Sequence, residues 1–99
     1  MATITEAERK ALERLLTHAQ RDSGQSRRVA DFLLAWWNAK SCGGFDITSA
    51  WGLDDTIAAD VITVFGAAVR CNVYPDTLGF GPQFEQIVRE WRPELASED

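Results

Sequence analysis

This sequence has few residues of the types that carry catalytic chemistry. Its 99 residues include two cysteines, Cys42 and Cys71, and one histidine, His18. Two thiols and one imidazole fall short of a four-ligand zinc site, and a lone histidine without a placed partner does not make a nucleophilic triad. We therefore predict no catalytic, cofactor-binding or metal site. Both cysteines are expected to be buried free thiols, with an exposed, reactive Cys42 beside the loop glycines as the alternative.

The sequence also lacks a long apolar run. The longest strongly apolar stretch, Phe32 to Trp37, is far shorter than the ~20 residues that span a bilayer. Glu6 and Glu8 stand where a signal peptide has basic residues followed by an apolar core. These features predict a cytoplasmic protein that does not enter a membrane.

Basic residues are in the minority, with ten Lys and Arg against fifteen Asp and Glu and a net charge of −5. The excess of acidic residues lies after residue 45, where the sequence has ten acidic and three basic residues. Only Arg21, Arg27, Arg28 and Lys40 make a modest basic cluster, so direct nucleic-acid binding is not expected. The first explanation for this acidity is that it keeps the protein soluble; the alternative is that the acidic half meets a protein partner with a basic surface.

Apolar residues recur with helical spacing along most of the chain. Thr5 and Glu8 fit a capping box that starts a helix over about residues 5–22, with a narrow apolar stripe. In the next predicted helix, residues 27–38, apolar side chains sweep roughly 200° of the circumference, more than a surface helix shows. Other helices should therefore pack around it. Its adjacent Trp36 and Trp37 point about 100° apart, so we expect that they do not both face one neighbour.

Two further helices are predicted after a loop at Gly43-Gly44. Asp54 should cap a helix over about residues 55–71, whose broad apolar face holds Ile57, Val61, Val64, Phe65 and Val69. Gly66 and the alanines near it should let another helix approach closely. Before this helix, one short turn should carry inward the side chains of Ile47, Ala50 and Trp51.

The last helix should start at Gly81-Pro82 and end at Pro93, with an inward face of Phe84, Ile87, Val88 and Trp91. No good alternating strand pattern occurs. The sequence thus predicts an all-α fold, a compact bundle of about four helices packed around the central Trp-rich helix. It forms one domain over residues 1–99, frayed at residues 1–4 and 94–99.

Candidate binding residues come from the tryptophans and the acidic residues. Core filling is the first explanation for the tryptophans, but this residue type is also enriched at binding hot spots. Because Trp36 and Trp37 diverge, one of them is a candidate for an interface with another copy or with a different protein. Asp54, Asp55 and Asp60 lack the further oxygen ligands that a hard cation needs. We expect these three carboxylates on a helix start and a solvated face, where they are available to a partner.

Three linked segments carry a resemblance: Phe32 to Ala39, Cys42 to Asp46, and Tyr74 to Glu85. With Trp51-Gly52 and the Trp91-Arg92-Pro93 ending, they resemble a family of small proteobacterial proteins of unknown function. Members are found on integrative and conjugative elements, plasmids and genomic islands. The similarity spans about residues 26–95 and leaves out the first helix. It implies a setting, but no active site.

From these observations we expect a helical accessory protein of a mobile genetic element that binds another protein and has no catalytic activity. A homo-oligomer is compatible with this expectation. The alternative is an inhibitor of a host defence complex such as CRISPR–Cas, which presents carboxylates in place of DNA phosphates. That alternative rests on analogy, because a fold does not define a function. An enzyme and a direct DNA-binding protein rank below both.

Overall fold

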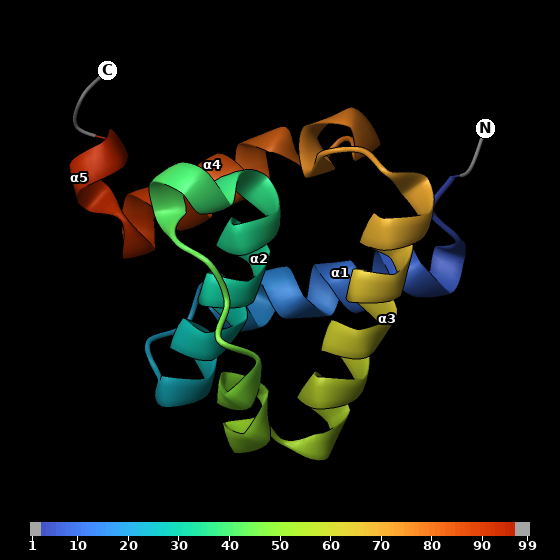
Figure 1. Cartoon of the computed structure of the whole chain (residues 1–99), viewed down its shortest axis with the longest axis horizontal. Helices are drawn as coiled ribbons and strands as arrows, with labels where there is room; N and C mark the ends of the chain where they lie inside the picture. Colours follow the sequence, from blue (N-terminus) through green and yellow to red (C-terminus); the bar gives the residue numbers. More distant parts are fainter. Residues whose placement is uncertain (1–2, 97–99) are drawn as a thin grey trace.

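The computed structural model describes residues 3–96, which form helices and loops and no strand (Figure 1). Five α-helices and two short 3-10 helices follow one another as α1 (Glu6–Ala19), α2 (Gly24–Cys42), η1 (Ile47–Gly52), α3 (Asp55–Cys71), η2 (Pro75–Leu78), α4 (Gly81–Trp91) and α5 (Pro93–Ala96). The predicted all-α fold with four longer helices is therefore confirmed.

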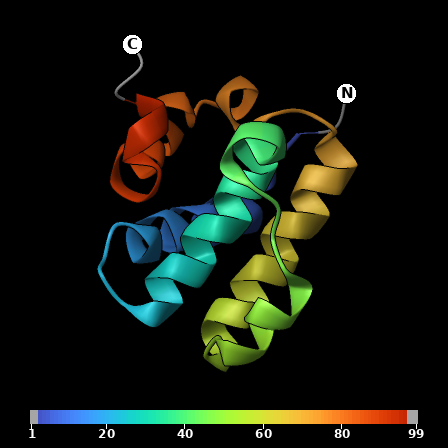
Figure 2. The same cartoon turned by 60° about the vertical axis from the view of Figure 1, so that its left-hand side comes forward.

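Two helices, α1 and α2, contact most of the other helices. Helix α1 runs behind α2 and α3 and contacts both of them, while α4 crosses the upper part of α2 (Figure 1). Helix α2 contacts α1, α3, α4 and η1, as expected of a central helix. In the turned view α2 and α3 lie side by side (Figure 2), but each of them packs more extensively on α1 than on the other. The narrow apolar stripe of α1 did not predict that this helix contacts three others, α2, α3 and α4.

Local capping interactions explain where the first two helices begin. The Thr5 hydroxyl accepts a hydrogen bond from the Glu8 backbone N–H at 3.1 Å, and Glu8 Oε1 accepts one from the Thr5 N–H at 2.9 Å. This is the predicted capping box. Helix α1 ends at Ala19 instead of residue 22, because the chain turns there to bring Ser23 to the N-cap of α2.

Helix α2 continues four residues beyond its predicted end, but with a break at Asn38. The Asn38 backbone is non-helical, with φ −168° and ψ 83°. Its side-chain oxygen accepts a hydrogen bond from the Ser41 N–H at 3.2 Å and so starts one last turn. Gly43, with φ 98°, then takes a conformation that suits glycine and ends the helix.

Phe84 of α4 joins α4 to α2 at the centre of the core. Its side chain is fully buried. The Trp36 ring meets it edge-on at 5.9 Å between ring centroids, and the Trp37 ring stacks on it at 5.6 Å. The expectation that the two tryptophans cannot face one neighbour is wrong. They do diverge, but a phenyl ring set in the angle between two indoles contacts both of them.

The ends of the described chain are held in place. Trp91 Nε1 donates a hydrogen bond to the Ala19 carbonyl at 2.7 Å, and Leu95 of α5 packs against the core. At the other end, Ile4 packs against the core as well. The fraying predicted for residues 1–4 and 94–99 stays a prediction; within it, Ile4 and Leu95 are the residues that the structure places against the core. Residues 1–2 and 97–99, where fraying was also predicted, lie outside the described residues.

None of the helices between residues 3 and 96 combines the length and the apolar character that crossing a bilayer requires.

The role of Phe84 can be tested against a second phenylalanine that lies at the surface. Replacing Phe84 with alanine should lower the free energy of unfolding by about 3–5 kcal/mol, because it leaves a cavity beneath both tryptophans. Phe65 is 60% exposed. Replacing it with alanine should change the free energy of unfolding by no more than about 0.5 kcal/mol. Denaturant titration of both variants in dilute protein measures the difference. Equal losses would contradict the packing described above.

Candidate functional site

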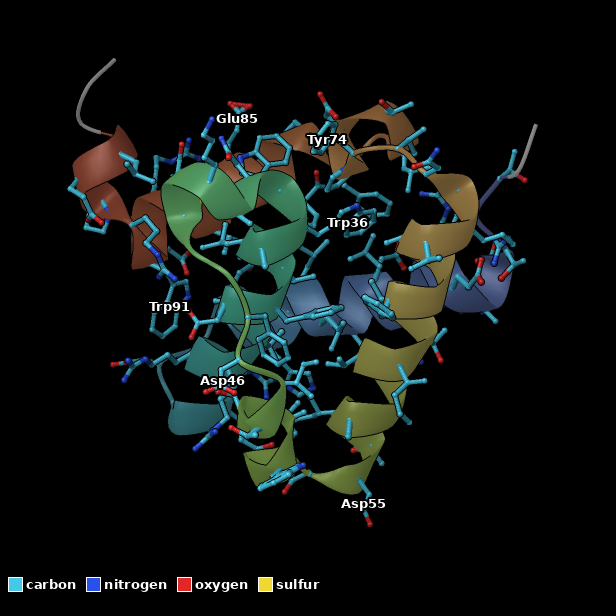
Figure 3. All side chains as sticks on the ribbon, in the orientation of Figure 1. Trp36, Asp46, Asp55, Tyr74, Glu85 and Trp91 are labelled. Atoms are coloured by element: carbon cyan, nitrogen blue, oxygen red, sulfur yellow. The ribbon has the colours of Figure 1, made fainter. Side chains whose placement is uncertain are left out.

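Two of the three candidate carboxylates lie together at the start of α3. Asp54 is the N-cap residue and Asp55 is in the first turn, and both are exposed. The Asp54 side chain makes no capping hydrogen bond, so its carboxylate faces solvent. Its backbone N–H instead donates to Gln25 Oε1 of α2 at 2.7 Å. This places two free carboxylates beside η1, at the end of the molecule where Figure 3 labels Asp55.

The third carboxylate, Asp60, is used inside the fold. Arg14 of α1 donates to both of its oxygens, from Nε at 2.8 Å and from Nη2 at 2.9 Å. The Asp60 side chain is only 13% exposed. The prediction of a solvated Asp60 is wrong, because α3 turns this position toward α1. Asp54, Asp55 and Asp60 therefore do not form one surface.

The two candidate tryptophans are half-buried and serve the core. Besides its contact with Phe84, Trp36 donates a hydrogen bond from Nε1 to the Val73 carbonyl at 3.1 Å. A hollow of about 340 Å³ lies beside its ring, lined by Trp36, Ala68, Val69, Asn72, Val73 and Tyr74. A second hollow next to it involves Trp37, Asn38, Tyr74 and Asp76. Trp36 therefore borders a shallow, largely apolar depression, and Trp37 borders a more polar one.

The most exposed large apolar side chains were not the predicted ones. They are Ile47, Trp51, Ile62, Phe65, Val69 and Tyr74. Trp51 is 82% exposed, although it was expected to point inward with Ile47. Within η1 no residue is buried, because this short turn lies on the surface against Arg28. The prediction that Ile47 and Trp51 face the core is wrong, whereas Ala50 packs against the core as predicted.

Helix α3 is apolar on two sides, and only one of them meets the core. Ile57, Val61 and Val64 are buried as predicted. Phe65 and Val69 were assigned to the same face, and this is wrong, because both are exposed on the side turned away from α1. Gly66 has no atom within 4 Å of the position that a Cβ would take. The expected close approach of another helix at Gly66 does not occur within the described chain.

The residues with reactive side chains are not gathered into a site. Cys42 and Cys71 are free and buried, as predicted, and burial raises the pKa of the Cys42 thiol. The alternative of a reactive Cys42 in a loop is wrong, because Cys42 ends α2 under the cover of the core. Among residues 3–96 no three His, Cys, Asp or Glu side chains lie close enough to hold a metal ion.

Ion pairs between arginine and carboxylate side chains join helices that are distant in the sequence. Arg70 at the end of α3 contacts both oxygens of Glu8, at 2.5 and 2.6 Å, and also donates to the Thr3 carbonyl. This guanidinium, together with the capping bond from Thr5, lowers the pKa of Glu8 to about 2. Near the C-terminal end, Arg92 binds Asp31 and the Cys42 carbonyl.

These observations define a small all-α protein whose surface carries two apolar regions, one on η1 and one on the outer side of α3. Comparison with known proteins then places it more closely. Residues 9–92 match the family described as "Family of unknown function (DUF7673)", and the chain belongs to this family. The match includes most of α1, which the sequence resemblance left out. No curated protein and no solved structure matches the chain.

The Glu8–Arg70 pair predicts how stability depends on pH. The pKa of Glu8 is lowered from 4.5 to about 2 in the folded chain. Its contribution to stability is therefore complete above pH 4.5 and is lost as the pH falls toward 2. The Glu8→Gln variant should show a smaller fall in its denaturant midpoint between pH 5 and pH 2 than the wild type.

The matched control for this measurement is Glu85→Gln, because Glu85 is exposed on α4. Its midpoint should fall with pH as the wild-type midpoint does. If Glu8→Gln and Glu85→Gln follow the same pH curve, the Glu8–Arg70 pair does not stabilise the fold.

Proposed function

We propose that this chain is a non-catalytic binding protein that docks on another protein with a basic surface, through η1 and the start of α3. The observation that carries the proposal is Trp51, which is 82% exposed on an ordered turn. Ile47 is exposed on the same turn. Large aromatic residues of this kind supply much of the affinity at protein interfaces, and nothing in the described chain covers this one.

The turn that presents Trp51 is held rigidly. Asp46 accepts hydrogen bonds from the N–H and the hydroxyl of Thr48 at 2.9 and 2.7 Å. Arg28 of α2 donates to the Ser49 carbonyl at 2.9 Å. A Cβ on Gly52 would lie only 2.7 Å from the Arg28 guanidinium carbon, so glycine makes this close contact possible. A preorganised turn loses less conformational entropy when a partner binds.

Acidic side chains surround the exposed turn. Asp46 precedes η1, and Asp54 and Asp55 follow it; all three are exposed, and Figure 3 shows Asp46 and Asp55 on this part of the molecule. The hydrogen bonds from Thr48 lower the pKa of Asp46, which keeps it ionised. Three carboxylates around an apolar centre outnumber the one guanidinium beside it, that of Arg28, and this excess fits a basic partner, whose encounter it would accelerate at low salt.

The biological setting is proposed from the sequence resemblance. The tryptophan pair and the Tyr74 to Glu85 segment resemble small proteins of proteobacterial integrative elements, plasmids and genomic islands. That resemblance supports an accessory protein of a mobile genetic element that acts in the cytoplasm. The family itself is of unknown function.

A DNA-mimicking inhibitor of a defence complex ranks second. A mimic needs a stripe of carboxylates that are free to meet arginines and lysines of its target. Glu8, Asp31 and Asp60 are each paired with an arginine of the same chain. These three carboxylates are therefore not free to bind the basic residues of a target. This favours binding through the smaller surface around Trp51 over binding as a DNA mimic.

The test compares variants of the full chain against the partner that it captures in a proteobacterial host. Trp51→Ala should weaken binding to that purified partner about 30-fold, as loss of a hot-spot residue does. Asp54→Asn combined with Asp55→Asn should weaken it less and reduce its dependence on salt. Asp60 is left unchanged, because it belongs to the fold.

The control variant is Tyr74→Ala, an exposed aromatic residue at the opposite end of the molecule in Figure 3. It should bind the partner as the wild type does. If Trp51→Ala also retains full affinity, the turn is not the docking surface and the proposal fails.

A further inference from the structure

Two adjoining hollows open beside the tryptophans of α2, and Tyr74 lines both of them. The first, of about 340 Å³, lies beside Trp36 and is largely apolar. The second, also of about 340 Å³, is more polar and is bordered by Trp37, Asn38 and Asp76. Three aromatic side chains and one carboxylate thus border a continuous depression in the surface.

We propose that these hollows bind a small organic ammonium ion, with its charged head beside Asp76 and its hydrocarbon part against Trp36. Figure 3 shows Tyr74 and Trp36 toward the end of the molecule opposite Asp55, away from the turn that carries Trp51. The site is therefore separate from the docking surface proposed above, and it does not depend on that function.

The two indole walls are held in place by the core. Trp36 donates a hydrogen bond from Nε1 to the Val73 carbonyl at 3.1 Å and meets the Phe84 ring edge-on. Trp37 stacks on the same ring, with 5.6 Å between the ring centroids. Side chains that are already fixed lose little conformational entropy when a ligand binds.

The third wall, Tyr74, projects from a constrained part of the chain. Asn72 ends α3 in the left-handed conformation, with φ 56° and ψ 41°, which asparagine adopts more readily than most residues. Pro75 follows Tyr74 and restricts it to an extended backbone, with φ −77° and ψ 157°. The Tyr74 side chain is 64% exposed, so it stands at the surface between the two hollows.

The charge beside these rings favours a cation. Asp76 is the one charged residue that lines either hollow in the described part of the chain. Its Oδ1 accepts a hydrogen bond from the Thr77 N–H at 2.9 Å, and its Oδ2 has no such partner within residues 3–96. Lys40 and Arg70 are the basic residues nearest in sequence, but neither lines a hollow, and Arg70 is bound by Glu8.

This combination selects among ligand classes. An anion would be repelled by Asp76, and a neutral ligand would gain nothing from its charge. Aromatic faces attract cations, and quaternary ammonium ions are a class that aromatic cages recognise. The largely apolar hollow beside Trp36 suits a short hydrocarbon chain attached to such a head.

Choline and 3,3-dimethylbutan-1-ol test the charge, because the alcohol is the uncharged isostere of choline. In NMR titrations of the full chain, choline should bind with a Kd of about 1 mM, as expected of an open site. The alcohol should bind at least about tenfold more weakly. Choline should shift the indole N–H signals of Trp36 and Trp37 and leave those of Trp51 and Trp91 in place.

Variants test the named walls. Asp76→Asn keeps an oxygen for the Thr77 N–H but removes the charge, so it should weaken choline binding about fivefold or more without changing the affinity for the alcohol. Tyr74→Ala should abolish choline binding, whereas Tyr74→Phe, which keeps the ring, should retain most of it. The matched control for charge is Asp22→Asn, an exposed residue before the other end of α2, which should bind choline as the wild type does.

Tetramethylammonium and butyltrimethylammonium test the hydrocarbon part. The butyl chain should raise the affinity about tenfold, because it covers apolar surface in the hollow beside Trp36. Val69→Ser replaces an apolar side chain that lines this hollow and should remove most of the gain. The affinity for tetramethylammonium should stay as in the wild type.

The outcomes decide the proposal. Absence of choline binding up to about 50 mM, equal affinity for the alcohol, or shifts at Trp51 in place of Trp36 and Trp37 overturns it. Equal affinity for the two ammonium ions overturns the assignment of the apolar hollow. None of these results alters the test of the Trp51 turn, whose readout is the affinity for a different protein.

Discussion

The contact of Phe84 with Trp36 and Trp37 holds the second half of the chain on the first. Phe84 enters the angle between the two indoles, so that α4 cannot slide along α2 without breaking both ring contacts. The hydrogen bond from Trp36 to the Val73 carbonyl fixes the loop that leads to α4. Both tryptophans thus take part in the core, and the most exposed large apolar side chains lie elsewhere, on η1 and on the outer side of α3.

Helix α3 has an inner side that packs on α1 and an outer side that is exposed. Arginine–carboxylate pairs join the two helices, Arg14 with Asp60 and Arg70 with Glu8. These pairs hold the apolar residues Ile57, Val61 and Val64 against α1. The opposite side of the same helix exposes Ile62, Phe65 and Val69, and nothing within residues 3–96 covers these side chains.

Capping residues and the spacing of apolar residues predicted the helices well. They did not predict contacts between residues that are far apart in the sequence. The Thr5–Glu8 capping box and the regular spacing of apolar residues in α4 correspond to what the structure shows. Phe65 and Trp51 were placed inward because hydrophobicity does not say which side of an apolar segment meets the protein. Asp60 was placed in solvent because its partner, Arg14, lies 46 residues away, and no local pattern indicates such a pair.

The central claim is that Trp51 lies outside the fold while Trp36, Trp37 and Trp91 take part in it. Acrylamide quenching of tryptophan fluorescence in dilute protein tests this claim most directly. Replacing Trp51 with phenylalanine should remove most of the readily quenched emission and shift the remaining spectrum to shorter wavelength. If the quenching and the spectrum stay as in the wild type, Trp51 is not the exposed tryptophan, and the proposed binding surface has no anchor.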